Sequence, residues 1–220
     1  MQPECGSGAE AVGFVLAGGL STRMGQDKAL ALLAGRPLVS YALRTLRLSG
    51  LSASIAGARS SLDSFAPVIA DPGLGPLAGV CAALASASAP TAVFLSVDMP
   101  LLPSSLITAL VNDAQATGAA VTVPSVNGYA QTFPAILSRI ILPILQRSLC
   151  EGDRGCYRAF QAAAEQLDSP IRILPVELLA QAGKVSHPEG LPAWFWFWNV
   201  NTPGDLARAK GLLGAPDRVS

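Results

Sequence analysis

Two runs of apolar residues restrict the fold of this chain more than any other feature. Residues 11–17 read AVGFVLA and residues 91–98 read TAVFLSVD, and both runs are apolar almost throughout. A strand with one solvated face would alternate between apolar and polar residues, so these runs indicate strands that are buried on both faces. Such strands are typical of parallel sheets that are covered by helices on both sides.

The rest of the chain alternates between short strand-like and longer helix-like segments. Further strands are expected at residues 52–57, 67–71, 119–125, 131–137, 171–176 and 194–200. Helices are expected at residues 37–48, 76–87, 103–118, 140–149, 157–167 and 203–213. This alternation predicts βαβ units, and therefore a Rossmann-like, three-layer α/β/α fold with a mostly parallel central sheet. No repeat or long linker divides the chain, so residues 1–220 are expected to form one domain.

Composition limits the partners that such a chain can bind. Half of the 220 residues are hydrophobic, 14% are charged and the formal net charge is zero. Enough apolar material is present for a folded core. No excess of basic residues is available to bind nucleic acid or an anionic membrane. Any anionic ligand must therefore be bound by a local group of backbone N–H groups and a few cations.

The cysteines and the single histidine are typical of a protein in a reducing compartment. Cys5, Cys81, Cys150 and Cys156 form no C-x-x-C pair, and together with His187 they give no zinc ligand set of the usual spacing. We expect free thiols, and a solvated His187 in a loop. The N-terminal segment lacks the features of a signal peptide, and no apolar run approaches the ~20 residues that span a bilayer. A cytoplasmic location is expected.

The segment that follows the first strand combines close access to the backbone with positive charge. Residues 16–28 read LAGGLSTRMGQDK. Gly18 and Gly19 let a ligand lie against the backbone, while Arg23 and Lys28 supply two cations. The combination suits nucleotide phosphates, although it matches neither the Walker A nor the G-x-G-x-x-G pattern. The alternative is an ordinary glycine-rich turn with solvated charges.

Two further loops are expected at the same edge of the sheet, because the carboxyl ends of parallel strands meet there. Residues 71–79 (DPGLGPLAG) place Asp71 and Pro76 at a strand-to-helix turn, where helix N–H groups can face an anion. Asp98 ends the most apolar strand, and its carboxylate beside a phosphate loop is a candidate Mg²⁺ ligand. The alternatives are a tight turn without a ligand and a capping or turn aspartate.

In this order, the motifs resemble those of the molybdenum cofactor guanylyltransferase family, also called molybdopterin-guanine dinucleotide biosynthesis protein A (MobA). The match comprises LAGG-x-S-x-RMG-x-DK at residues 16–28, GPLAG at 75–79, D-x-P at 98–100 and NVNTP-x-DL at 199–206. Weaker similarities are Gln131 and the GDRG segment that contains Arg154. The resemblance extends over nearly the whole chain. It implies a GTP-binding domain with a nucleotide-diphospho-sugar transferase-like fold.

The resemblance also implies roles for individual residues. The implied nucleotide-binding set is Leu16, Ala17, Gly18, Gly19, Lys28, Asp71 and Asp98. The implied catalytic residues are Arg23, Lys28 and Asp98, with Asp98 as the Mg²⁺ ligand. The implied acceptor-binding set is Gln131, Arg154, Asn199 and Asn201. One position departs from the family: members can carry an asparagine on the second strand that contacts the nucleotide, where this chain offers Ala56 or Gly57.

The reaction implied by the resemblance is transfer of GMP from GTP to molybdopterin or the molybdenum cofactor, with release of pyrophosphate. The N-terminal half would bind the nucleotide and the C-terminal half the acceptor. Other proteins of molybdenum-cofactor biosynthesis are candidate partners. The alternatives are a related transferase that uses CTP or a sugar phosphate, and a non-catalytic GTP-binding protein. Gly18 favours GTP by resemblance, because related CTP enzymes tend to read LAAG where this chain reads LAGG.

All three tryptophans lie within residues 194–198, which read WFWFW. Aromatic residues are common in strands, so packing at the edge of the sheet or in the core is the default interpretation. A platform that stacks on a pterin ring is the alternative. For Arg154, binding of a substrate phosphate and simple solvation near a helix start are equally compatible with the sequence.

Overall fold

The computed structural model describes residues 10–18, 27–57 and 60–213. Its strands are β1 (Ala11–Leu16), β2 (Leu32–Leu33), β3 (Arg36–Pro37), β4 (Ala53–Ala56), β5 (Val68–Ile69), β6 (Thr91–Ser96), β7 (Val121–Val126), β8 (Tyr129–Ala130), β9 (Ala135–Ser138) and β10 (Arg172–Pro175). Its α-helices are α1 (Leu38–Leu48), α2 (Pro76–Ser86), α3 (Ser104–Thr117), α4 (Leu142–Cys150), α5 (Cys156–Gln166), α6 (Val176–Gln181), α7 (Ala193–Trp196) and α8 (Pro203–Leu212).

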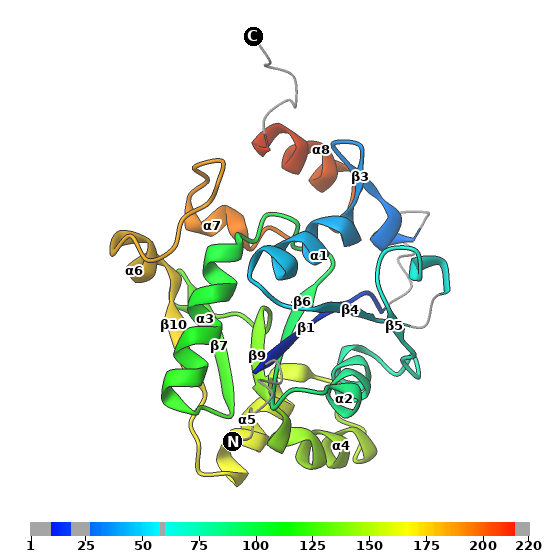
Figure 1. Ribbon diagram of the computed structural model, residues 1–220, viewed down its shortest axis with the longest axis vertical. Coiled ribbons are helices and arrows are strands. Elements are labelled where there is room, and N and C mark those ends of the chain that lie inside the picture. The colour runs from blue at the N-terminus through cyan, green and yellow to red at the C-terminus, as the bar shows by residue number, and fades with distance from the viewer. Residues whose placement is uncertain (1–9, 19–26, 58–59, 214–220) are drawn as a thin grey trace, which may run out of the picture.

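One sheet forms the centre of the molecule (Figure 1). Its strands follow the order β10-β7-β9-β6-β1-β4-β5, and β8 pairs with β7 beside this path. β1 is parallel to β4 and β6, β4 is parallel to β5, and β10 is parallel to β7. β9 runs in the opposite direction and pairs antiparallel with both β6 and β7. The prediction of a mostly parallel central sheet is confirmed.

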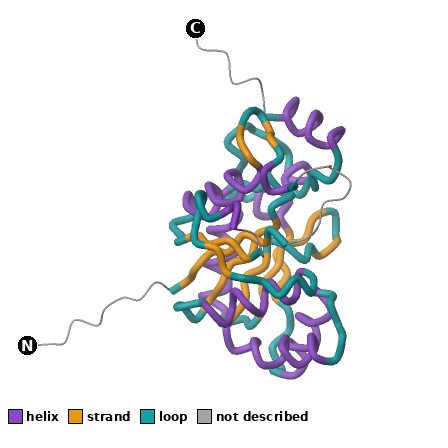
Figure 2. Tube along the Cα trace, turned by 90° about the vertical axis from the view of Figure 1, so that its right-hand side faces the viewer, coloured by secondary structure: helices purple, strands orange, loops and turns teal. Residues whose placement is uncertain are grey.

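Helices cover both faces of this sheet, as Figures 1 and 2 show. Buried side chains form two separate cores, one beneath α1, α3 and the C-terminal helices, and the other beneath α2, α4 and α5. β1 contributes to both, because Val15 belongs to the first core and Phe14 to the second, where its ring stacks on Phe94. Burial on both faces explains the continuous apolar runs, and the three-layer α/β/α prediction is confirmed.

Gly13 determines how closely α1 lies on the sheet. A Cβ at this position would lie 2.8 Å from Cδ2 of Leu46, which is too short for two carbon atoms. The glycine therefore leaves room for the fully buried Leu46 side chain to pack directly on β1. This contact fixes the position of α1 over the first strand.

One predicted strand is wrong. Residues 194–200 form no strand: α7 ends at Trp196 and the chain continues without regular structure. Trp196 is buried, and its Nε1 donates to the carbonyl of Leu191 at 2.7 Å. The Trp198 ring packs against Arg208, whose Cζ lies 4.4 Å from the ring centroid. Burial of the rings in a tertiary core outweighs the strand preference of aromatic residues.

Two other predicted strands change at their boundaries, and one predicted helix end is confirmed. The strand expected at residues 131–137 is shorter, because only β9 (Ala135–Ser138) forms there. The preceding strand β8 instead returns along β7 through a tight turn at Asn127 and Gly128, whose φ angles are 51° and 79°. The strand expected at residues 171–176 ends at Pro175, where α6 begins. The predicted C-cap of α3 is confirmed, since Gly118 adopts the left-handed conformation there.

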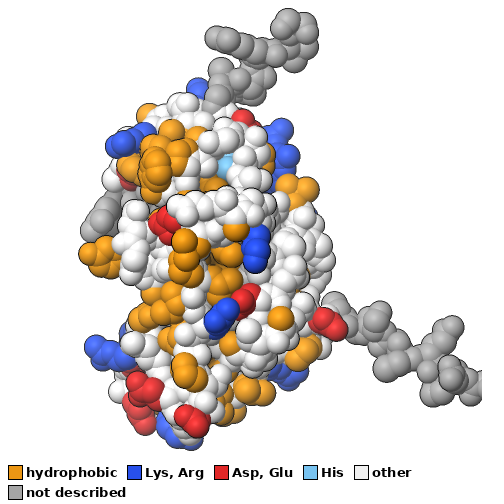
Figure 3. Space-filling model, turned by 90° about the vertical axis from the view of Figure 1, so that its left-hand side faces the viewer, with side chains coloured by type: hydrophobic (Ala, Val, Ile, Leu, Met, Phe, Trp, Pro, Cys, Tyr) orange, Lys and Arg blue, Asp and Glu red, His pale blue; other side chains and the backbone are white. Residues whose placement is uncertain are grey.

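The described surface and thiols agree with the composition. On the face shown in Figure 3, basic and acidic side chains are interspersed, with no continuous basic field. Cys81, Cys150 and Cys156 are free, and burial raises the pKa of Cys81 to about 11 and that of Cys156 to about 12. Within residues 10–18, 27–57 and 60–213, no helix is long and apolar enough to cross a membrane.

Candidate active site

The loops that follow β1, β5 and β6 meet at one edge of the sheet. Beyond the strands, the Val97 N–H donates to the carbonyl of Leu16 at 3.2 Å, and the Ala17 N–H donates to the carbonyl of Ala56 at 2.9 Å. These bonds continue the parallel ladder past the strand ends. Leu16 and Ala17 were both predicted to bind nucleotide through their backbone, but the Leu16 carbonyl and the Ala17 N–H are already used inside the sheet. The next residue, Gly18, is exposed at this edge.

Lys28 connects two of the predicted motifs. Asp27 caps the 3-10 turn Lys28–Leu30 by accepting the Ala29 N–H at 3.0 Å, and this cap orients the lysine. The Lys28 ammonium donates to Asp98 Oδ2 at 3.0 Å and to Asn201 Oδ1 at 2.6 Å. A cation, a carboxylate and an amide from three distant segments thus lie together at the edge where the loops converge.

The second carboxylate oxygen of Asp98 has no partner within the described part of the chain. Asp98 Oδ1 is inaccessible to solvent and makes no hydrogen bond among the described residues. A buried carboxylate oxygen without a donor is costly, so its position calls for a cation or a donor supplied by a ligand. Oxygen from one or two carboxylates is the usual protein contribution to a Mg²⁺ site that also includes phosphates. The donor set at Asp98 therefore fits this metal.

The C-terminal motif is shaped by a capping box at the start of α8. Thr202 is the N-cap, and its hydroxyl accepts the Asp205 N–H at 3.2 Å. Asp205 Oδ2 in turn accepts the N–H groups of Asn201 and Thr202, each at 2.9 Å. The Asn201 N–H bond, followed by the Thr202 hydroxyl, lowers the pKa of the Asp205 carboxyl. The carboxylate thus fixes the backbone that directs Asn201 toward Lys28.

Asp205 is a site residue that the sequence interpretation missed. It lies inside the NVNTP-x-DL motif but was given no role of its own. The signal was present, because threonine followed three residues later by an acidic residue is typical of a capping box.

Asp71 lies in a narrow space between two glycines. The side chain is buried, and its Oδ1 accepts the Gly73 N–H at 2.8 Å. A Cβ at Gly18 would lie 2.9 Å from Asp71 Oδ2, and a Cβ at Gly79 would lie 3.2 Å from the same oxygen. The distance of 2.9 Å is too short for a carbon and a carboxylate oxygen, so a side chain at position 18 would force Asp71 to move. Gly18 and Gly79 therefore bring the first and second loops together around a single carboxylate oxygen.

Arg154 lies beside the N-terminus of α2. A Cβ at Gly75, the N-cap of that helix, would lie 4.0 Å from the Cβ of Arg154. A cavity of about 620 Å³ opens here, lined by Pro76, Thr132, Phe133, Asp153, Arg154, Gly155, Cys156, Tyr157 and Arg158. Asp153 forms a long ion pair with Arg158 at 3.7 Å. Within the described residues, the exposed Arg154 side chain makes no hydrogen bond or ion pair.

The remaining predicted residues are less closely connected. Gln131 precedes Thr132 of this cavity, and its Nε2 donates to the carbonyl of Tyr129 at 3.0 Å. Asn199 is exposed, and it directly precedes Val200, whose N–H donates to the carbonyl of Asp98 at 2.8 Å. Gly19 and Arg23 lie outside the described residues.

His187 lies in a loop, as expected, but it is partly buried and not fully solvated. The imidazole is partly buried, its centroid lies 6.3 Å from that of the Trp196 ring, and its Nδ1 accepts the Glu189 N–H at 3.0 Å. Tertiary packing, which a loop sequence does not reveal, encloses it.

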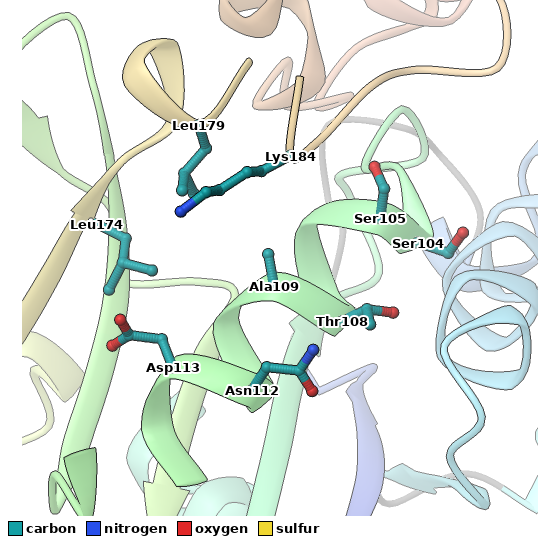
Figure 4. A pocket seen from close by; sticks show the side chains of 9 residues that line it. All are labelled: Ser104, Ser105, Thr108, Ala109, Asn112, Asp113, Leu174, Leu179 and Lys184. Atoms are coloured by element: carbon teal, nitrogen blue, oxygen red, sulfur yellow. The ribbon is translucent and has the colours of Figure 1, made fainter. Parts of the chain in front are cut away.

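A second cavity lies away from the cluster of Lys28 and Asp98. It also measures about 620 Å³ and is bounded by α3, β10, α6 and the segment that carries Lys184 (Figure 4). None of the predicted site residues lines it. Asp113, on its floor, is paired with Arg172 through two hydrogen bonds of 2.9 and 3.0 Å.

Sequence comparison identifies the relatives of this chain. The family model described as a MobA-like NTP transferase domain matches residues 13–168. A molybdenum cofactor guanylyltransferase from Serratia proteamaculans is 36% identical over 163 residues, which cover 70% of this chain and 81% of that protein. A second one, from Xanthomonas euvesicatoria, is 44% identical over 105 residues, which cover 47% of this chain and 54% of that protein.

The fold has close counterparts among solved structures. Molybdopterin-guanine dinucleotide biosynthesis protein A from Archaeoglobus fulgidus superposes with a TM-score of 0.73 at 23% identity, covering 91% of this chain and 97% of that one. The fold, the residues matched by the family model and the sequence relatives all indicate the same family. The chain belongs to the MobA-like NTP transferase family.

Proposed function

We propose that this protein transfers GMP from GTP to molybdopterin or the molybdenum cofactor and releases pyrophosphate. Relatives that carry this activity in their names match it over most of their length. The observation that carries the proposal is the contact of Lys28 with both Asp98 and Asn201. It joins a candidate phosphate-binding cation, a candidate metal ligand and a residue of the candidate acceptor motif in one place.

Asp71 is our candidate for recognition of the base. Its Oδ2 lies between Gly18 and Gly79, where a ligand can approach the backbone of both loops. A carboxylate accepts two hydrogen bonds, and the N1–H and N2–H₂ groups of guanine are two adjacent donors. Cytosine presents one amino donor beside acceptors, so it matches a carboxylate less well. This geometry supports GTP over CTP, and it offers a polar contact that could replace the one absent at Ala56.

Asp98 is our candidate for holding Mg²⁺, through the buried oxygen that makes no hydrogen bond to any residue the structure describes. When bound, the metal would neutralise charge on the phosphate oxygens. Without ligands, Lys28 neutralises the carboxylate instead, at 3.0 Å. The triphosphate offers Lys28 a more strongly charged partner, so we propose that the ammonium moves to the phosphates and leaves Asp98 to the cation.

The chemical step needs positioning more than a protein nucleophile. A phosphate oxygen of the acceptor forms a bond to the α-phosphorus of GTP. The bond from that phosphorus to the oxygen bridging the β-phosphate breaks, and pyrophosphate leaves with the electron pair. Lys28 lies where it can stabilise charge on the leaving group, and we assign the same role to Arg23 from its position in the loop.

The acceptor is assigned to the C-terminal half of the chain. Arg154 lies beside the cavity next to α2, and its guanidinium is unpaired as far as the described residues show. Asn201 contacts Lys28, on the proposed metal side. Gln131 and Asn199 are retained as weaker candidates. The bond between Lys28 and Asn201 supports a reaction centre where residues from both halves meet. The cytoplasmic location and further partners in molybdenum-cofactor biosynthesis stay predictions.

A pyrophosphate-release assay tests the proposal. GTP, CTP, UTP and ATP are each offered with molybdopterin, with Mg²⁺ or with a chelator. We expect release with GTP and Mg²⁺ only. Release with CTP instead would identify a cytidylyltransferase. A rise in melting temperature with GTP but no pyrophosphate in any mixture would indicate a non-catalytic GTP-binding protein, because a ligand of the folded state raises its stability.

A further inference from the structure

The cavity between α3, β10 and α6 has no part in the proposed reaction. Its volume of about 620 Å³ is within the range of sites that bind small molecules. Part of its lining is apolar and comes from Leu174 of β10, Leu179 of α6 and Ala109 of α3. Leu174 belongs to the buried core, and the other two side chains pack against that core. An apolar group in this cavity would therefore extend the core outward.

Two charged residues line this cavity, and their surroundings differ. Asp113 accepts hydrogen bonds from Nε and Nη2 of Arg172 at 2.9 and 3.0 Å, so a guanidinium already neutralises its charge. Lys184 makes no side-chain hydrogen bond or ion pair within the part of the chain that the structure describes. The charge that the cavity offers to a ligand is therefore positive.

The backbone of Lys184 is fixed by the way in which α6 ends. Gly183 follows the C-cap of this helix and has a left-handed φ of 67°. Its N–H donates to the carbonyl of Ala180 at 3.0 Å, and the N–H of Lys184 donates to the carbonyl of Leu179 at 2.9 Å. These two bonds and the left-handed residue form a Schellman motif. The position at which the lysine leaves the helix is thus determined.

The residues after Lys184 are held against α3. Val185 is buried, and Ser105 Oγ donates to the carbonyl of Ser186 at 2.6 Å and accepts the Ser186 N–H at 3.1 Å. Figure 4 shows the Lys184 side chain extended across the cavity from this segment, while Ala109 projects into the same space from α3. The fold therefore presents an ammonium group, from a fixed backbone, over an apolar surface.

This combination suits one class of ligand. A carboxylate can form a charge-assisted hydrogen bond with the ammonium of Lys184, and an apolar body attached to it can cover the three apolar side chains. A neutral or cationic molecule with the same body lacks the first contact. A nucleoside triphosphate has several negative charges, which would meet one ammonium group and the carboxylate of Asp113. A singly charged anion matches the cavity better.

We propose that this cavity is a second binding site, for a small organic acid whose single carboxylate is attached to an apolar body. Lys184 binds the carboxylate, and Leu174, Leu179 and Ala109 contact the body. The site is independent of the proposed GMP transfer, because neither Lys28 nor Asp98 lines it.

Three ligands that share a naphthalene body test the choice of head group. 2-Naphthoate, 2-naphthamide and 2-naphthylmethylamine are titrated into the full chain, and binding is followed through the amide signals of ¹⁵N-labelled protein. We expect 2-naphthoate to bind with a dissociation constant of about 1 mM or lower, as the size of the ligand allows, and about tenfold more tightly than the other two. Equal affinity for all three ligands would overturn the proposal.

The same spectra show where the ligand binds. The amide signals of Ala109 and Leu179 should shift with 2-naphthoate, whereas that of Lys28 should not. The affinity should also be the same with and without GTP and Mg²⁺. Displacement of 2-naphthoate by GTP would place it in the nucleotide site and would overturn the proposal. A protein that does not bind GTP would contradict the proposed function but not this second site.

Variants of the two charged residues should act in opposite directions. Lys184→Met keeps the apolar stem and should weaken binding of 2-naphthoate by about tenfold, with 2-naphthamide unchanged, whereas Lys184→Arg should stay within about threefold of wild type. Asp113→Asn should strengthen binding of 2-naphthoate by about twofold to fivefold, because it removes a negative charge and releases Arg172. Lys210→Met, on α8 and away from the cavity, is the matched control. Wild-type affinity in Lys184→Met, or weaker binding in Asp113→Asn, would overturn the proposal.

Discussion

The two candidate binding regions at the edge of the sheet are built differently. Around Asp98, hydrogen bonds from distant segments fix both the side chain and the turn, and Lys28 and Asn201 join the same network. Around Arg154, the guanidinium groups are exposed, and the ion pair between Arg158 and Asp153 is 3.7 Å long. The first region is preorganised for ligands of fixed shape, whereas the second can adapt. We infer that the fold fixes the positions of nucleotide and metal, while the acceptor is bound by movable side chains.

The largest effect is expected at the centre of the preorganised region. Asp98→Asn should lower Mg²⁺-dependent pyrophosphate release by about a hundredfold or more, because the amide removes the charge that would hold the cation. Circular dichroism should be unchanged. Asp113→Asn, which breaks an ion pair with Arg172 far from the site, is the control and should keep wild-type activity. Wild-type turnover in Asp98→Asn would contradict the metal assignment.

Lys28→Met should reduce turnover by about tenfold to a hundredfold, because the leaving group loses a cation. The same change should strengthen binding of Mn²⁺ in the absence of nucleotide, since it removes the competing charge 3.0 Å from Asp98 Oδ2. Isothermal titration of the apoprotein measures this second effect. An unchanged or weaker Mn²⁺ affinity would show that Lys28 does not compete with the metal.

A third prediction concerns the glycine beside Asp71. Gly18→Ala places a Cβ 2.9 Å from Asp71 Oδ2, so the carboxylate must move. We expect the KM for GTP to rise about tenfold, with a smaller change for CTP, by loss of one charge-assisted contact. Gly211→Ala is the matched control, because nothing lies within 4 Å of a Cβ there. Equal effects on both nucleotides would remove Asp71 from base recognition.

The adaptable region should respond more weakly. Arg154→Ala is expected to raise the KM for the acceptor several-fold and to leave the KM for GTP unchanged, because an exposed cation contributes little. Arg158→Ala, whose guanidinium already pairs with Asp153, should have the smaller effect. Steady-state kinetics with each substrate varied in turn distinguish these outcomes. A change in the KM for GTP alone would place Arg154 on the nucleotide side.

The smallest effect concerns stability and pH. Burial holds the pKa of His187 below its ordinary value of 6.5, so the unfolded chain takes up a proton first as the pH falls. The stability that the neutral imidazole contributes is therefore fully present above pH 6.5, the pKa in the unfolded chain. It is lost as the pH falls through the lower pKa that His187 has in the folded protein. The difference in melting temperature between wild type and His187→Gln should be about 1–3 °C larger at pH 5.5 than at pH 8. A constant difference would show that His187 does not contribute to acid sensitivity.

The sequence predicts the layers of the fold and part of the candidate site. Apolar runs buried on both faces give the three layers, and the rule for parallel strands brings Gly18, Asp71 and Asp98 to one edge. The bond between Lys28 and Asn201 joins residues 173 positions apart, and no local pattern encodes it.

Two of the wrong strand predictions can be traced to particular features of the sequence. The Asn127–Gly128 pair is a strong hairpin signal, and it would have predicted β8 as a short strand that returns along β7. The aromatic segment was misread because composition alone does not tell a strand from a short helix whose rings are buried, as for Trp196.

The reversed strand β9 has a consequence for how this family can diversify. Because β9 is antiparallel to β6, it begins at the edge where β6 ends, with Ala135 opposite Phe94. The loop that precedes β9 includes Thr132 and Phe133, which line the cavity beside Arg154. This loop therefore reaches the site at the point where β9 begins. Such a connection can gain or lose residues without disturbing the sheet. A new acceptor can thus evolve, or be engineered, while the half that binds the nucleotide stays intact.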